Sequence, residues 1–128
     1  MLRLFYIAFG GAAGSLLRYW ASGLAHRIGG SSFPWGTLSV NLIGSFLIGF
    51  LWGMFESVIV PRNTRILIFI GLLGSFTTFS TFTLESFNLI RDGEYGLFLA
   101  NIVSSFTLGI ALVFAGYFLS RFLFNIAR

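Results

Sequence analysis

Four apolar segments, each close to the length of a membrane-spanning helix, dominate this chain of 128 residues. They run approximately over residues 4–25, 37–55, 65–85 and 97–120, and short polar stretches separate them. A helix needs about 20 apolar residues to cross a hydrocarbon core of about 30 Å. The pattern therefore predicts an all-α membrane protein, with four transmembrane helices forming a single domain over residues 1–128.

Charge is too scarce for a water-soluble fold. Charged residues make up 9% of the chain and hydrophobic residues 56%, whereas soluble domains carry about 25% charged residues. We therefore expect lipid to be a partner along the whole chain. The apolar run after Arg3 lacks a small-residue cleavage pattern, so we interpret it as a retained first span rather than a signal peptide.

Several classes of function are disfavoured. The eight basic residues are all arginines scattered along the chain, so the basic cluster typical of nucleic-acid binding is missing. The absence of cysteine excludes disulfides and thiolate metal sites. The lone histidine, His26, has no evident catalytic partner, and the sequence contains no nucleotide-binding motif, so an enzyme is not predicted.

The stretch from Thr77 to Thr83 is the most informative part of the third segment. Five of its seven residues carry a hydroxyl group and the other two are phenylalanines. An unpaired polar group in hydrocarbon costs several kcal/mol, so lipid-facing sequence has no use for so many hydroxyls. We expect this stretch to be buried in protein, where it can meet a small solute that accepts hydrogen bonds, most simply an ion.

The same stretch predicts an interrupted helix. Thr, Ser and Phe are mediocre helix formers, and Gly74 lies just before them. Phe76, Phe79 and Phe82 would form one stripe on a continuous helix, which is typical of core packing. They can also line a pore, because the positive edges of aromatic rings attract an anion weakly, as conduction requires.

Other polar residues in the segments allow two interpretations each. Asn41 and Asn101 can join helices, or their amides can donate to an anion. Arg18 can extend to the lipid headgroups, or supply a fixed positive charge at an aqueous vestibule. Glu85 can be an ordinary helix-end carboxylate, or accept hydrogen bonds within a polar track from Thr81 or its neighbours.

The arginines determine the orientation of the chain in the membrane only weakly. Three would lie on one side of the membrane (Arg18, Arg27 and Arg91), and five on the other (Arg3, Arg62, Arg65, Arg121 and Arg128). Such a balance permits insertion in both orientations, or in one orientation set by the small excess. Glycine pairs four residues apart, Gly10 with Gly14 and Gly49 with Gly53, predict close helix packing and oligomerisation.

The chain resembles the small bacterial fluoride channels, of the camphor-resistance (CrcB) type, over almost its whole length. The resemblance is carried by a stretch from Gly11 to Trp20 that includes Arg18, by Gly36-Thr37-Leu38-x-x-Asn41, and by Gly74-x-x-Thr77-Thr78-Phe79-Ser80-Thr81-Phe82-x-x-Glu85. The last of these motifs is the most specific. The identity of the ion, fluoride, comes from this resemblance, because composition indicates only a small membrane pore for anions.

The resemblance implies an antiparallel, dual-topology homodimer with two pores in the bacterial inner membrane. It implies a third helix that breaks between Gly74 and Thr77, with a structural sodium ion held by backbone carbonyls at those two positions of each subunit. The sodium ion is not transported. A hard cation suits carbonyl oxygens that unwinding has released.

The resemblance also assigns roles to side chains. The fluoride pore would contain Phe79, Phe82, Asn41, Ser80, Thr81 and Glu85, and Arg18 would lie in the vestibule. The fourth helix departs from the family pattern, with Asn101 where an aromatic residue is common and Gly109 where a serine is common, while Ser105 is kept. The contribution of this helix is therefore left open.

We hypothesise a fluoride-specific channel that exports cytoplasmic fluoride passively and reduces its toxicity. The first alternative is a small proton-coupled drug exporter, which would need a carboxylate deep in a span. The four acidic residues, Glu56, Glu85, Asp92 and Glu94, all lie near predicted span ends, which disfavours it. The second alternative is an assembly subunit without transport activity, whose polar groups only join helices.

Overall fold

The computed structural model describes residues 1–126, and every regular element in that range is a helix. Arg128, which was counted in the charge balance, lies outside the described residues. The elements are α1 (Leu2–Gly29), α2 (Trp35–Ser57), α3 (Arg62–Arg65), η1 (Ile66–Leu73), α4 (Gly74–Phe76), α5 (Phe79–Arg91) and α6 (Tyr95–Ile126). The element η1 is a π-helix, which is wider than an α-helix.

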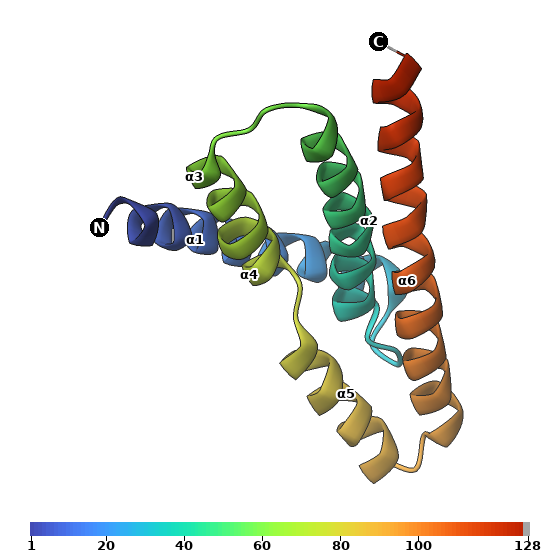
Figure 1. The fold of residues 1–128 in the computed structure, drawn as a ribbon. Coiled ribbons are helices and arrows are strands. Elements are labelled where there is room, and N and C mark those ends of the chain that lie inside the picture. Colours follow the sequence, from blue (N-terminus) through green and yellow to red (C-terminus); the bar gives the residue numbers. More distant parts are fainter. Residues whose placement is uncertain (127–128) are drawn as a thin grey trace.

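The third segment is interrupted, as the sequence predicted. The elements α3, η1 and α4 follow one another as a single rod, and an extended link separates them from α5 (Figure 1). Thr77 (φ −83°, ψ 158°) and Thr78 (φ −149°, ψ 118°) form this link. Gly74 itself is still helical, with φ −63° and ψ −29°, so the chain leaves the helix at the two threonines.

Three stretches in the described part of the chain are long and apolar enough to cross a membrane. They are α2, the interrupted stretch from Arg62 to Arg91, and Tyr95–Phe124 within α6. The helix α1 is long enough but is not among them, because Arg3, Arg18 and many small residues lower its hydropathy. The prediction of four helical segments is confirmed, and the apolar character of a span is confirmed for three of them.

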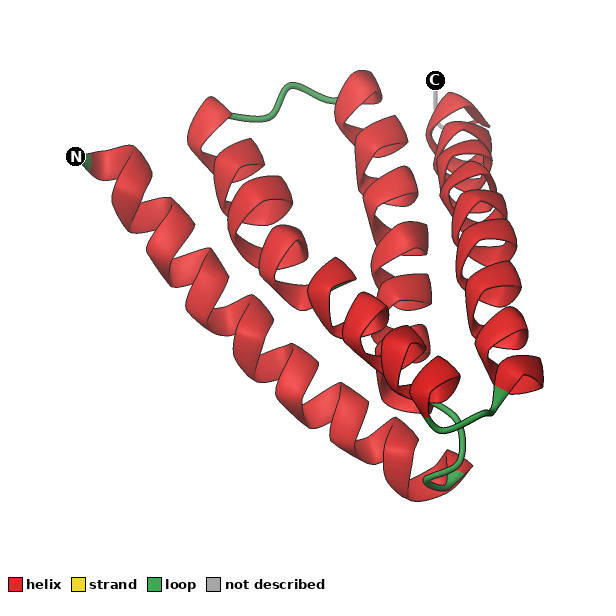
Figure 2. Cartoon of the chain, turned by 90° about the horizontal axis from the view of Figure 1, so that it is seen from below, coloured by secondary structure: helices red, strands yellow, loops and turns green. Residues whose placement is uncertain are grey.

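The helices α2 and α6 lie side by side along most of their length and run in the same direction (Figures 1 and 2). Glycines permit this close contact. A Cβ atom added to Gly49 would overlap the Val113 carbonyl, and one added to Gly116 would overlap the Phe46 carbonyl. The packing role predicted for Gly49 is confirmed.

The helix α1 contacts the rod formed by η1 and α4 and passes behind it in Figure 1. Gly10 and Gly14 lie at the crossing and are the buried residues of α1. A Cβ atom on Gly10 would overlap the Leu67 carbonyl oxygen, and one on Gly14 would overlap the Leu72 carbonyl oxygen. This second glycine pair therefore also packs as predicted, and it fixes the rod that leads into the break.

Candidate functional site

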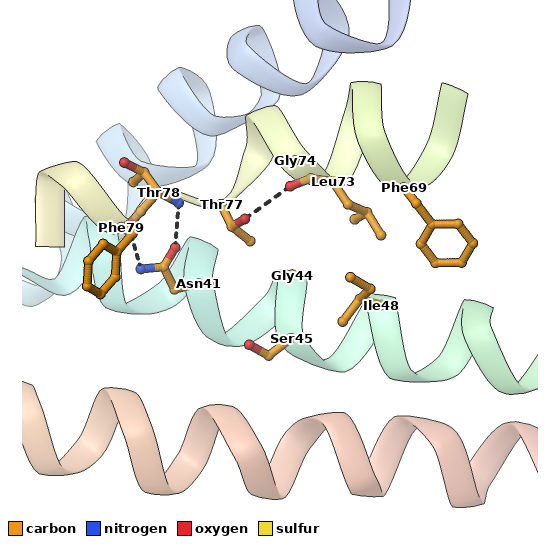
Figure 3. Close-up of a pocket in the computed structure, with 10 residues that line it drawn as sticks. All are labelled: Asn41, Gly44, Ser45, Ile48, Phe69, Leu73, Gly74, Thr77, Thr78 and Phe79. Atoms are coloured by element: carbon orange, nitrogen blue, oxygen red, sulfur yellow. Dashed lines mark hydrogen bonds between the residues drawn. The ribbon is translucent and has the colours of Figure 1, made fainter. Parts of the chain in front are cut away.

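The side chain of Asn41 holds the break in the third segment. Its Nδ2 atom donates to the Thr78 carbonyl at 3.0 Å, and its Oδ1 atom accepts from the Thr78 N–H at 2.8 Å. Figure 3 shows both bonds reaching from α2 to the extended link. One amide therefore satisfies the whole backbone of a residue that has left the helix. Of the two sequence interpretations, this geometry matches the helix-joining one.

The break releases backbone carbonyls from their usual helical partners, and those of Gly74 and Thr77 are among them. In a continuous α-helix the Gly74 carbonyl would accept from the Thr78 N–H, which here bonds to Asn41. The Thr77 carbonyl would likewise accept from the Thr81 N–H, which here bonds to Thr78 Oγ1 at 3.3 Å. The carbonyls of Gly74 and Thr77 are the two at which the resemblance places a sodium ion.

These residues share one open cavity of about 320 Å³ on the face of the bundle. Figure 3 shows Asn41, Thr78 and Phe79 at one end of it and Phe69 at the other. The full lining consists of Asn41, Gly44, Ser45, Ile48, Phe69, Leu73, Gly74, Thr77, Thr78 and Phe79. Hard cations prefer oxygen ligands, and this lining contains no soft side chain. The backbone carbonyls of Gly74 and Thr77 therefore fit a sodium ion.

Hydroxyl groups continue from the break along α5. Thr78 Oγ1 donates to Thr81 Oγ1 at 3.0 Å and lies 3.4 Å from Ser80 Oγ. Ser80 and Thr81 are both exposed in the single chain. The hydroxyls of these three residues, Thr78, Ser80 and Thr81, are therefore contiguous.

The next member of the predicted track, Glu85, has a different partner from the one expected. Its Oε1 atom accepts from Thr37 Oγ1 of α2 at 2.9 Å, rather than from Thr81. Its Oε2 atom is buried and has no hydrogen-bond partner among the described residues. The Thr37 hydroxyl was missed, although it lies one helical turn before Asn41 in the same sequence motif.

A second cavity, of about 470 Å³, opens beside Thr81 and Glu85 at the end of α1. Its basic residues are Arg27 and His26, and Arg18 does not line it. Arg18 is half-buried elsewhere on α1 and makes no ion pair within the described chain. The sequence offered no signal for Arg27 beyond its position at the end of the first segment.

The phenylalanine rings do not form the stripe that a continuous helix would give. Phe79 and Phe82 are neighbours, with ring centroids 5.8 Å apart and planes at 39°. Phe82 also meets Phe106 of α6 edge-on, at 6.0 Å and 79°. Phe76 lies before the break and is buried at 7% exposure, whereas Phe79 is 70% exposed. The three-residue repeat fails as a stripe because the extended link separates Phe76 from the other two rings.

The fourth helix contributes a buried amide. Asn101 is 1% exposed, and its Nδ2 atom donates to Ser86 Oγ at 3.0 Å. Ser86 in turn donates to the Phe82 carbonyl at 2.7 Å, so this chain of bonds ties α6 to α5. Ser105 Oγ is buried without a hydrogen-bond partner in the described residues. A Cβ atom on Gly109 would make only ordinary contact with Ser45, at 3.7 Å.

A helical membrane protein whose span is broken at a cluster of hydroxyls, ring edges and released carbonyls has the features of a small ion channel. The comparison with known proteins gives the same class. Residues 5–117 match the family model described as "CrcB-like protein, Camphor Resistance (CrcB)". The chain belongs to this family of CrcB-like proteins.

Curated relatives named "Fluoride-specific ion channel FluC" match almost the whole chain. The protein from Parabacteroides distasonis is 47% identical over 94% of both chains. The protein from Maridesulfovibrio salexigens is 46% identical over 94% of this chain and 97% of its own. The protein from Solidesulfovibrio magneticus is 45% identical over 93% of this chain and 96% of its own.

Proposed function

We propose that this chain is a fluoride-specific ion channel of the bacterial inner membrane, through which cytoplasmic fluoride leaves passively. The observation that carries the proposal is the break at Thr77 and Thr78, from which a row of hydroxyls and two phenylalanine rings extend along α5. The chain that contains this site is 47% identical to a protein named as a fluoride-specific ion channel. Fluoride is a small ion that accepts hydrogen bonds strongly, which is the solute such donors suit.

The permeation path is proposed to follow α5. The hydroxyls of Ser80 and Thr81 would donate to the ion, and the ring edges of Phe79 and Phe82 would face it. The residues of this row, from Phe79 to Phe82, carry no charged side chain, so the ion is held weakly enough to leave again. Asn41 and Glu85 complete the proposed pore lining, with Thr37 fixing the Glu85 carboxylate.

The working assembly is proposed to be an antiparallel, dual-topology homodimer of one four-helix domain over residues 1–128, in which α1 also crosses the membrane. Two observations support this assembly. Phe79 is 70% exposed in a single chain, so the proposed pore is open on one side until a second copy covers it. The nearly balanced arginine distribution permits both orientations.

A structural sodium ion is proposed at the break, held by the carbonyls of Gly74 and Thr77 from both subunits. Both carbonyls have lost their regular helical donors, as described above. When bound, the ion would balance the partial negative charge of these carbonyl oxygens at the dimer centre and would not be transported.

Arg18 is proposed to supply positive charge at the vestibule, because no carboxylate pairs with it within the described chain. Arg27 is proposed to supply a further positive charge in the cavity beside Glu85.

Purified protein in liposomes loaded with potassium fluoride is expected to release fluoride when valinomycin permits charge balance. Release follows from passive conduction, since the vesicles contain no energy source. A fluoride electrode measures the efflux, and a chloride electrode measures the matched chloride-loaded sample. Absence of fluoride efflux would favour the assembly-subunit alternative, and equal chloride efflux would remove the proposed selectivity.

A further inference from the structure

We infer that Asn41 acts as a positioning residue for the sodium site, by keeping the Gly74 carbonyl free to bind the cation. The inference rests on the sodium site of the proposed function. This role is additional to the place of Asn41 in the proposed pore lining. The observation behind it is a competition between two oxygen atoms for one backbone N–H group.

The competing acceptors are Asn41 Oδ1 and the Gly74 carbonyl. In a continuous helix the Thr78 N–H would bond to the Gly74 carbonyl. Here Asn41 Oδ1 accepts that N–H at 2.8 Å, while Asn41 Nδ2 donates to the Thr78 carbonyl at 3.0 Å. The two bonds act together, since rotating the amide would break both. Asn41 therefore substitutes for the helix at this residue and leaves the Gly74 carbonyl without its donor.

The neighbouring turn of α2 is shaped to receive the break. Gly44 follows Asn41 by three residues and so lies on the same face of the helix. A Cβ atom on Gly44 would overlap the side-chain methyl group of Thr77. The absence of that atom lets the extended link lie against α2, close enough for the Asn41 amide to reach Thr78. One face of α2 thus supplies both the space and the hydrogen bonds that stabilise the break.

The consequence is a coupling between Asn41 and cation binding. Without the Asn41 oxygen, the Thr78 N–H is left unpaired at membrane depth, and the nearest way to satisfy it is to restore its bond to the Gly74 carbonyl. That bond would occupy the oxygen that the cation needs. The aspartate variant separates the two amide functions, because its carboxylate can accept from the N–H but cannot donate to the carbonyl.

The test measures thermal unfolding of the purified full chain in detergent, in sodium chloride and in the chloride salt of a large organic cation. The melting temperature of the wild type is expected to rise by about 3–6 °C for each tenfold increase in sodium above its dissociation constant. The Asn41→Leu variant is expected to lose this rise. The Asn41→Asp variant is expected to keep it, because it retains the acceptor for the Thr78 N–H.

The control is Asn88→Leu, the same replacement almost three turns beyond Thr78 on α5, which is expected to keep the full sodium response. A full response in Asn41→Leu overturns the inference, as does a lost response in Asn41→Asp. If Asn41→Leu does not fold, the Asp variant decides alone. A wild type without any sodium response would overturn the sodium site and this inference with it, while fluoride efflux would still stand as a separate measurement.

Discussion

Replacement of Phe82 by isoleucine is expected to reduce fluoride efflux by at least about tenfold, which corresponds to about 1.4 kcal/mol at the conduction barrier. The ring of Phe82 lies beside Phe79 and is held edge-on by Phe106. Isoleucine keeps much of the volume but has no positive ring edge to turn toward an anion. The loss should therefore appear in ion flux more than in folding.

The matched control for this prediction is Phe87→Ile, which makes the same change further along α5 at a ring that is 59% exposed. Phe79→Ile is expected to behave like Phe82→Ile, because the two rings are neighbours. Efflux is measured in liposomes at equal protein content, and gel filtration confirms that each variant remains uniformly folded. Normal efflux from a folded Phe82→Ile protein would contradict the proposed role of the rings.

The second large effect is expected on folding, from Gly14→Val at the crossing of α1 and the rod. A Cβ atom there would overlap the Leu72 carbonyl oxygen and approach the Phe76 nitrogen to 3.1 Å. Both are backbone atoms of the rod, so no side chain can move aside to relieve the overlap. Overpacking typically costs about 1–3 kcal/mol, and a rigid backbone neighbour places this site at the upper end of that range.

Gly23→Val provides the comparison, since it makes the same change on the same helix where no atom lies within 4 Å of the added Cβ. Thermal unfolding in detergent is expected to show a clearly lower melting temperature for Gly14→Val than for Gly23→Val. Equal melting temperatures in the two variants would mean that α1 does not cross the rod at Gly14.

Much of the fold could be predicted because membrane insertion imposes a strong pattern on sequence. Apolar runs separated by polar stretches gave the four helical segments, and the hydroxyl-rich stretch gave the break. The pairs that contain Gly10 and Gly49 indicated close packing, which the structure confirms. These predictions depend on local composition, which a single sequence records directly.

The details of the site depend on contacts between segments, and these were less predictable. The partner of Glu85 is Thr37, 48 residues away, and spacing along one helix could not reveal it. The alternative in which Phe76, Phe79 and Phe82 form one stripe required a continuous helix, and the break excludes it. The two sequence interpretations of Asn41 were separated only when the structure placed its amide on Thr78.

The extended link at Thr77 and Thr78 also has an electrostatic consequence, because it creates two helix ends inside one span. The rod before it terminates in peptide oxygens without helical donors, which carry a partial negative charge equivalent to about half an electron. The helix α5 begins on the other side of the link, with a partial positive charge of about the same size at Phe79. A single interruption of the backbone can thus offer adjacent attractive fields to ions of opposite sign, without any ionised side chain.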